Sequence, residues 1–364
     1  MSSLALNAFE GKEFSPEEEI VSICARQKLT EQDKQNYRSI AASGNIDWDK
    51  VLGVSEENQV TPLVYRNLQV LKGFPDKIFM SLRESAARTM ARNTLILSRM
   101  EKFSRKEDAL FLKGFPFAVD VYEDPSLREF SDVDVLVRDM DAFGRVLSEE
   151  GFHPDDNEED DGYRSQRTYA DKDGLVIDAH VDAIGRRLHS EMTGLGEGMW
   201  EGARHLEYGG LKLKTPDLEH TLIFQAVHLA MHHGFSGLKW LVDINEFVRR
   251  YENEIDWERL LELCSKYKVK RPVYYTLLFT RDLFDTPVPE KVLDRFSRVR
   301  RPLDRWLFRK IKNSFGTDYL AELFMFDTIA DTVKFVFLSF VKYPGHFLCF
   351  GRIAGKVVRA AVSK

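Results

Sequence analysis

The chain has few cysteines, and we expect no signal peptide at its start. Its 364 residues include three cysteines, Cys24, Cys264 and Cys349, with no C-x-x-C pair among them. This excludes a disulfide framework and a zinc ribbon. The opening residues, MSSLALNAFEGKEF, lack both the basic start and the apolar run of a signal peptide. We therefore expect a cytoplasmic protein.

An excess of positive charge is also missing. The formal net charge is -6, so the chain as a whole offers no basic field for gathering nucleic acid, although a local patch remains compatible with it. With 43% hydrophobic and 30% charged residues, the composition is that of a soluble globular protein. The length is sufficient for two or three packed lobes.

Hydrophobic periodicity divides the chain into three zones. Residues 1–106 follow a helical period after a capping box at Ser15-Pro16-Glu17-Glu18. Residues 107–215 shift to the shorter period of strands, which we expect at ALFLKG, DVDVLV, RSQRTYA and GLVIDAHV. Residues 171–174 supply the turn of an antiparallel hairpin between the last two. Residues 216–364 return to helices after the start signal at Thr215-Pro216-Asp217. The predicted fold is α+β, with a small mixed sheet between N- and C-terminal helical lobes.

Two aspartates one residue apart open the second expected strand, in the sequence REFSDVDVLV. A strand sends alternate residues to the same side, so Asp132 and Asp134 should project together. Such carboxylates repel each other unless a cation or a proton lies between them. Two other Asp-x-Asp pairs have structural explanations, because Asp139 is placed as a helix N-cap and Asp171 lies in the hairpin turn.

Two further features lie on neighbouring segments. Gly114, after Lys113 in FLKGFPF, stands where a strand turns into a helix, and glycine there lets a phosphate approach the backbone. A simple tight turn explains the glycine equally well. Asp178 in LVIDAHV is a lone carboxylate in a β-branched run, with His180 on the same face. A satisfied residue of an edge strand is the structural alternative for Asp178.

Together these features resemble the nucleotidyltransferase superfamily that shares its core with DNA polymerase β. More narrowly, the chain resembles the bacterial family called "uncharacterised nucleotidyltransferase". The resemblance rests on LKG from Leu112, Y-x-D-P-x-x-R from Tyr122 and SDVDVLV from Ser131. It continues through IDAH from Ile177 and AVHLAMHHGFSGLKWLVDINEFV in the helical zone. Gly114-Phe115 replaces the superfamily's usual Gly-Ser or Gly-Gly.

The resemblance implies a metal-dependent transfer of a nucleoside monophosphate from a nucleoside triphosphate, with ATP the expected donor, to an unidentified acceptor, with release of pyrophosphate. Three carboxylates cannot hold a triphosphate without cations, so two Mg²⁺ ions, or Mn²⁺ in their place, are expected. Asp132 and Asp134 would hold both ions. Asp178 would complete one metal site and serve as the general base.

The same resemblance implies a set of phosphate ligands. Lys113, Gly114, Arg128 and Ser131 would hold the phosphates, which supplies the positioning and charge neutralisation that phosphoryl-type transfer requires. For Lys113 and Arg128, a solvated base near a turn is the structural alternative. The acceptor could be a small molecule, a sugar phosphate, a protein side chain or RNA.

Other patterns leave alternatives open. His228 and His232 are four residues apart on one helix face, a spacing that can ligate a metal, and Asp243 follows. This suggests a His-Asp-type metal phosphohydrolase as the rival function, but the helix has no Glu beside His228 and no upstream His-Asp dipeptide. We therefore expect these histidines to pack within the lobe or to face the acceptor cleft. A non-catalytic nucleotide- or partner-binding relative is a further alternative.

Three charged segments could lie on the protein surface. The acidic run at 155–161 is interpreted as a solvated loop. The basic stretch from Arg295 to Lys312 would be the contact surface of an RNA-modifying enzyme. The basic and aromatic tail from Val333 is too interrupted to span a bilayer. It could lie on a membrane surface or pack on its own lobe.

Overall fold

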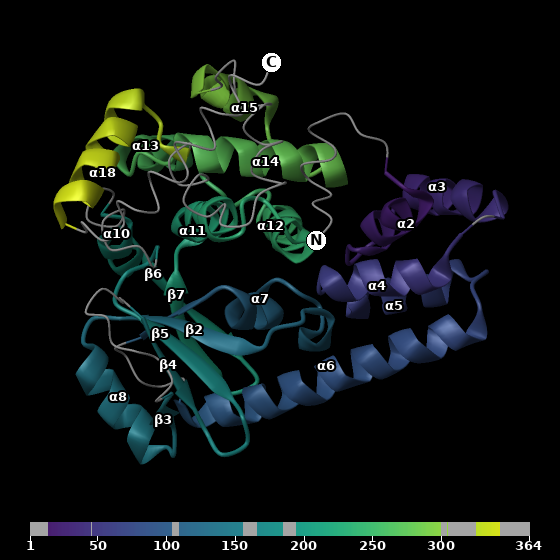
Figure 1. The fold of residues 1–364 in the computed structure, drawn as a ribbon, viewed down its shortest axis with the longest axis horizontal. Helices are drawn as coiled ribbons and strands as arrows, with labels where there is room; N and C mark the ends of the chain where they lie inside the picture. Colours follow the sequence, from purple (N-terminus) through teal and green to yellow (C-terminus); the bar gives the residue numbers. More distant parts are fainter. Residues whose placement is uncertain are drawn as a thin grey trace.

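The computed structural model describes residues 14–44, 46–103, 109–155, 166–184, 194–299, 304 and 325–342. Within these ranges the predicted α+β class is confirmed, because a small mixed sheet is surrounded by helices (Figure 1). The acidic run, the greater part of the basic stretch and the tail beyond residue 342 fall outside the described residues. The interpretations of these segments therefore remain predictions.

Among the described residues, five helices precede the sheet, and the capping box predicted at Ser15 starts the first of these. The Ser15 side chain accepts from the Glu18 backbone, and the Glu18 carboxylate accepts from the Ser15 N–H. This reciprocal pair satisfies two donors that a helix start otherwise leaves unpaired. The helices are α2 (Pro16–Cys24), α3 (Glu31–Ala42), α4 (Trp48–Glu57), α5 (Thr61–Leu71) and the long α6 (Asp76–Phe103), which runs from this lobe to the sheet (Figure 1).

The sheet has the strand order β1-β2-β5-β4-β3. Its central pair, β2 and β5, is parallel, whereas β1 with β2, β4 with β5 and β3 with β4 are antiparallel. The β4–β5 pairing confirms the predicted hairpin. The strands are β1 (Ala109–Leu112), β2 (Asp132–Val137), β3 (His153–Pro154), β4 (Gln166–Ala170) and β5 (Val176–His180).

Short helices connect these strands. After β1 the chain forms α7 (Gly114–Asp120) and the 3-10 turn η1 (Pro125–Leu127), and after β2 it forms α8 (Met140–Glu149). Asp139 caps α8 by accepting from the backbone N–H groups of Asp141 and Ala142, which confirms its predicted structural role.

The sequence patterns did not predict a second hairpin, formed by β6 (Ala203–Tyr208) and β7 (Leu211–Pro216) after α10 (Leu195–Glu201). The remaining described elements are helical, as expected, and Asp217 caps the first of them. They are α11 (Leu218–His232), α12 (Leu238–Arg250), α13 (Trp257–Lys266), α14 (Lys270–Phe284), α15 (Glu290–Phe296), the 3-10 turn η2 (Ser297–Val299) and α18 (Ile329–Lys342). Of the helices in the described ranges, none combines the length and apolar character that crossing a bilayer requires.

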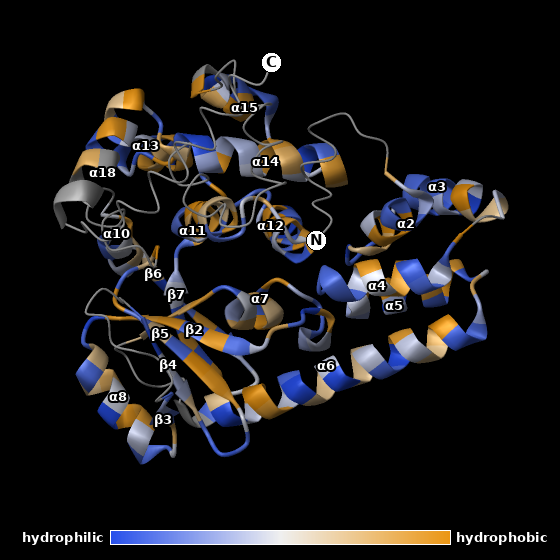
Figure 2. Cartoon of the chain, viewed as in Figure 1, coloured by the Kyte–Doolittle hydropathy of each residue, from blue (hydrophilic) through white to orange (hydrophobic). Residues whose placement is uncertain are grey.

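Two hydrophobic clusters hold these parts together. One cluster covers the face of the sheet to which β2 and β5 contribute Val133, Val135, Ile177 and Ala179, all of which are buried. Figure 2 shows hydrophobic colour along these two strands. The other cluster is continuous from the N-terminal helices through α7 to α11–α15. The two helical lobes thus share one core across the edge of the sheet. The division at residues 106 and 215 remains a prediction.

Candidate active site

The three aspartates singled out by the sequence lie together on one face of the sheet. The parallel register of β2 and β5 sets Asp134 directly opposite Asp178. Asp132 is two residues before Asp134 and projects on the same side. One carboxylate oxygen from each of the three lies within 4.8 Å of the others. The intervening valine and isoleucine side chains point into the opposite core, which fixes the orientation of both strands.

Asp134 is buried and has two cationic or hydrogen-bonding neighbours. The Lys113 ammonium lies 2.6 Å from its Oδ1, and His180 Nε2 lies 3.2 Å from the same oxygen. Burial opposes ionisation, yet Lys113 and His180 outweigh it and lower the pKa of Asp134 to about 2. Asp134 is therefore a permanent anion at neutral pH.

Asp178 has a different environment. Its carboxylate accepts a 2.7 Å hydrogen bond from the Thr168 hydroxyl on the neighbouring strand. Burial raises the pKa of Asp178, and the negative charges of Asp134 and Asp132 add to this effect despite the Thr168 bond. A carboxylate with a raised pKa is a better proton acceptor than an ordinary one, which suits a general base.

Asp132 completes the group at its more open side. It is half-buried, and its Oδ1 accepts a 3.0 Å bond from the neighbouring Ser131 hydroxyl. The Ser131 carbonyl in turn accepts from Arg92 of α6 at 2.9 Å. The long N-terminal helix thereby supports the segment that begins β2.

The carboxylate group fits hard divalent cations. Three acidic side chains face a single ammonium, so the cluster carries more negative charge than its protein neighbours balance. Its ligand atoms are all oxygens, which Mg²⁺ and Mn²⁺ prefer. In the described part of the chain, only these three aspartates form a group of three or more potential ligands spaced closely enough to hold a metal.

A small cavity of about 80 Å³ adjoins two of the carboxylates. Asp134, Asp178 and Lys113 line this acidic cavity together with His228 and His232 of α11. The C-terminal helical lobe therefore closes over the sheet face that carries the aspartates.

Lys113, predicted as a phosphate ligand, occupies an unusual backbone position at the end of β1. Its φ of 50° is rare for a residue with a side chain, and such conformations cost about 1–3 kcal/mol. The side chain of this strained residue is the one that pairs with Asp134. A phosphate could compete with Asp134 for this ammonium.

Gly114, which follows, is required by packing. A Cβ atom at this position would lie 2.9 Å from the Phe130 Cβ, so any side chain would force α7 away from the segment before β2. Steric crowding by Phe130 thus explains why glycine occupies this position. A contact between its backbone and phosphate remains a prediction.

Arg128 is placed differently from a phosphate ligand. Its guanidinium is 3% exposed and donates to both oxygens of Asp243, which is fully buried, at 2.6–3.0 Å. Tyr122 donates to the same carboxylate at 2.8 Å. These contacts describe a structural ion pair between the sheet region and α12. Ser131, by contrast, adjoins Asp132, and its contact with phosphate remains a prediction.

The His228–His232 pair does not present a free ligand set. The two rings stack with centroids 4.9 Å apart, and His232 Nε2 contacts the Ile184 carbonyl. His228 Nε2 lies 3.1 Å from His233 Nε2. Asp243 is engaged by Arg128 rather than by either histidine. Burial lowers the pKa of His228 well below its ordinary value, with a further contribution from Lys113, so this histidine is neutral. This geometry favours packing against the acidic cavity over a His-Asp metal site.

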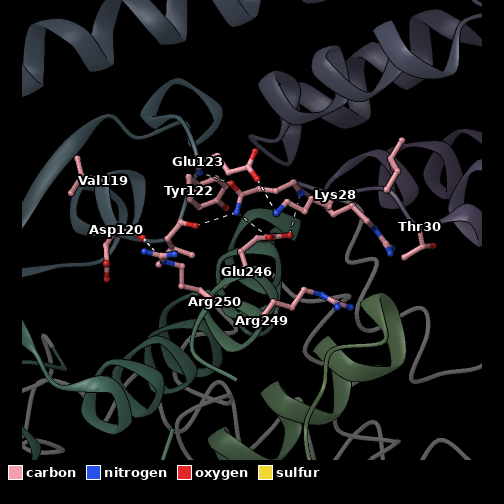
Figure 3. A pocket seen from close by; sticks show the side chains of 13 residues that line it. Lys28, Thr30, Val119, Asp120, Tyr122, Glu123, Glu246, Arg249 and Arg250 are labelled. Carbon is pink, nitrogen blue, oxygen red and sulfur yellow. Dashed lines mark hydrogen bonds and ion pairs between the residues drawn. The ribbon is translucent and has the colours of Figure 1, made fainter. Parts of the chain in front are cut away.

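A much larger cavity, of about 640 Å³, lies at the other end of α7 (Figure 3). Gln27 bridges two of its walls by donating to the Val121 carbonyl and to both oxygens of Glu246. Glu123 pairs with Lys28 at 3.1 Å and with Arg66 at 2.8 Å. We call this space the paired cavity, because its acidic groups are compensated by neighbouring protein groups.

Two supporting residues were not assigned to the site from the sequence. His180 was noticed on the face of Asp178, but its contact is with Asp134 on the next strand. Thr168 lies in a separate strand, and only the β4–β5 register places it opposite Asp178. The alternation of the GLVIDAHV strand could have identified His180, whereas no local signal identifies Thr168.

Comparisons with known proteins identify the family to which the chain belongs. A family model described as "Uncharacterised nucleotidyltransferase" matches residues 44–285, well over half of the chain. Among solved structures, the chain is similar to an antigenic nucleotidyltransferase-like protein from Paracoccidioides brasiliensis, with 14% identity and a TM-score of 0.30. That match covers 57% of this chain and 96% of the other. A search of curated proteins found no match.

Proposed function

The chain belongs to the family of uncharacterised nucleotidyltransferases, and on that premise we propose that it transfers a nucleoside monophosphate from a nucleoside triphosphate to an acceptor. The observation that carries the proposal is the convergence of Asp132, Asp134 and Asp178 within 4.8 Å on one sheet face. Three crowded carboxylates are unfavourable for stability, and a divalent-cation site explains their arrangement.

Each carboxylate has a distinct role in the proposal. Asp132 and Asp134 would hold Mg²⁺, and Asp178 would join them at the acceptor side. Bound Mg²⁺ supplies charge neutralisation for the triphosphate and lowers the barrier to loss of the acceptor proton. Asp178 accepts that proton, since its pKa is raised whereas the pKa of Asp134 is lowered. Thr168 orients the Asp178 carboxylate through its 2.7 Å bond.

Lys113 has a second role in this scheme. In the structure its ammonium neutralises Asp134, which is the function that a cation would take over. Once a cation balances Asp134, Lys113 becomes available for the triphosphate oxygens, with which a lysine ammonium pairs well. The donor tested first is ATP.

The test compares the wild type with Asp132→Asn and Asp178→Asn. Purified proteins are incubated with each labelled nucleoside triphosphate, Mg²⁺ or Mn²⁺, and candidate acceptors, and nucleotide binding and pyrophosphate release are measured. We expect both variants to lose at least about 10³-fold in transfer rate, the scale found when one member of a catalytic unit is removed. Asp141→Asn is the matched control, because Asp141 is 76% exposed and pairs only at the surface with Arg167.

The result that would overturn the proposal is equally concrete. If wild type and both variants bind nucleotide equally, with the same metal dependence, the aspartates do not form the metal site.

A further inference from the structure

A third cavity, of about 380 Å³, lies beside the aspartates and is built mainly by the N-terminal helical lobe. Its walls include Glu56 of α4, Gln59 of the following turn, and Arg88 and Arg92 of α6. Glu129 and Ser131, from the segment that enters β2, form the wall on the sheet side. We call this space the arginine cavity.

The arginine cavity adjoins the candidate metal site through one residue. Ser131 lines the cavity, and its hydroxyl donates to the Asp132 carboxylate at 3.0 Å. Carboxylate oxygens of Asp132, Asp134 and Asp178 lie within 4.8 Å of one another, and the last two residues line the acidic cavity. Ser131 therefore connects the arginine cavity to the candidate metal site.

The lining has the chemistry of an anion site. Arg88 and Arg92 are one helical turn apart on α6 and so project on the same side. Arg92 uses one nitrogen to bond the Ser131 carbonyl. Arg88 has no ion pair or hydrogen bond with any residue that the structure describes. A guanidinium group can bind a phosphate through two parallel N–H donors.

A third cation lies nearby on α12. The Lys239 ammonium contacts the Gln59 side chain and lies 4.4 Å from the centre of the Trp240 ring. Burial lowers the pKa of Lys239 to about 8, against the opposing negative charges of Asp243, Asp132 and Glu129. Through Gln59, which lines the arginine cavity, this ammonium adjoins the site.

The remaining lining is suited to hydroxyl groups. Glu56 and Glu129 supply carboxylate acceptors, and Gln59 supplies an amide. The volume of about 380 Å³ is in the range of small-ligand sites and far exceeds the space that a single phosphate needs.

We propose that the arginine cavity is the acceptor site and that it binds a phosphorylated polyol, with Arg88 and Arg92 on the phosphate and the carboxylates on the hydroxyls. The inference rests on the proposed function and specifies its acceptor. It also gives the N-terminal lobe a role in substrate binding, because α4, α5 and α6 together form most of the site.

The experiment measures binding by calorimetry with defined probes. These are ribose 5-phosphate and glycerol 3-phosphate, with ribose, glycerol and inorganic phosphate for comparison. Arg88→Gln and Arg92→Gln are compared with the wild type, and Arg83→Gln serves as the control, because Arg83 is an exposed arginine of α6 that does not line the cavity. We expect at least one phosphorylated polyol to bind more tightly than its unphosphorylated form and than inorganic phosphate. Both cavity variants should weaken that binding by about tenfold or more, and the control should not.

Two further measurements are needed. One decides whether the arginines bind the acceptor phosphate or the donor triphosphate, and the other distinguishes failure of this inference from failure of the proposed function. If saturating MgATP expels the phosphorylated probe, the arginines hold the donor triphosphate, and the acceptor assignment is wrong. Asp132→Asn should lose metal-dependent ATP binding while it retains the probe, so failure of the proposed function is distinguishable from failure of the acceptor site. Absence of any preference for phosphorylated polyols, or equal weakening by Arg83→Gln, would also overturn the inference.

Discussion

The two ends of α7 face two polar cavities that balance their charges in opposite ways. At the C-terminal end, the paired cavity is large, but Glu123 and Glu246 are neutralised or hydrogen-bonded by neighbouring side chains. At the N-terminal end, the acidic cavity is about one-eighth as large, and one lysine faces three converging carboxylates. Uncompensated charge, rather than volume, therefore distinguishes the candidate active site.

A second contrast lies in what the carboxylates do. Asp243 is as buried as any residue in the protein, but two partners satisfy it, and it joins the sheet region to α12. Asp178 is accessible from a cavity and has one hydroxyl partner among the described residues, which leaves its second oxygen available. The first arrangement serves stability and the second serves chemistry, and mutations should separate the two.

The largest effect on stability is expected from Asp243→Asn. The substitution leaves the Arg128 guanidinium buried without its counter-charge, and breaking such a pair costs about 3–5 kcal/mol. Chemical denaturation would measure the loss, with Asp282→Asn as the matched control, because the Arg281–Asp282 pair is on the surface. A loss of less than 1 kcal/mol would show that the contrast between the two kinds of aspartate is wrong.

Asp132→Asn should have a smaller effect, of opposite sign. Removing one of three repelling charges is expected to stabilise the metal-free protein by about 1 kcal/mol, since solvent screens this half-exposed group. Thermal unfolding in EDTA measures this gain. Adding Mg²⁺ should then stabilise the wild type more than the variant, because binding to the folded state raises its stability. A variant less stable than the wild type in EDTA would contradict the repulsion argument.

The two central carboxylates should also differ in their pH dependence. The raised pKa of Asp178 means that its contribution to stability is fully present below 3.8 and is lost as the pH rises through the raised value. Asp134 behaves in the reverse way, and its contribution is lost only as the pH falls toward about 2. In EDTA, the wild type should therefore lose stability relative to Asp178→Asn as the pH rises above 3.8. A difference that does not change with pH would remove the basis for this assignment.

The smallest effect is expected at the rim of the paired cavity. Lys28 is 83% exposed in its pair with Glu123, which also retains Arg66. Lys28→Ala should change the free energy of unfolding by no more than about 0.5 kcal/mol and leave Mg²⁺ binding unchanged. A clear loss of metal affinity in this variant would show that the two ends of α7 are coupled.

Much of the sheet could be predicted from local patterns. The alternation in DVDVLV identified β2, and the residues at 171–174 predicted the β4–β5 hairpin, because turn residues and period-two alternation are encoded locally. The β6–β7 hairpin was missed, although Gly209-Gly210 stands at its turn. Its exposed strand Ala203–Tyr208 has only one fully buried residue, Leu206, so the hydrophobic alternation there is weak.

The candidate site also combines features that the sequence predicts with features that depend on the tertiary structure. Which residues carry charge, and which neighbours share a strand face, was determined by the sequence, because the strand period is local: Asp132 and Asp134 had to project together. That Asp178 lies opposite Asp134, that Thr168 reaches it and that Arg128 pairs with Asp243 was decided only by the tertiary structure. These contacts join residues from 10 to 115 positions apart, and no short-range pattern specifies the register or packing that brings them together.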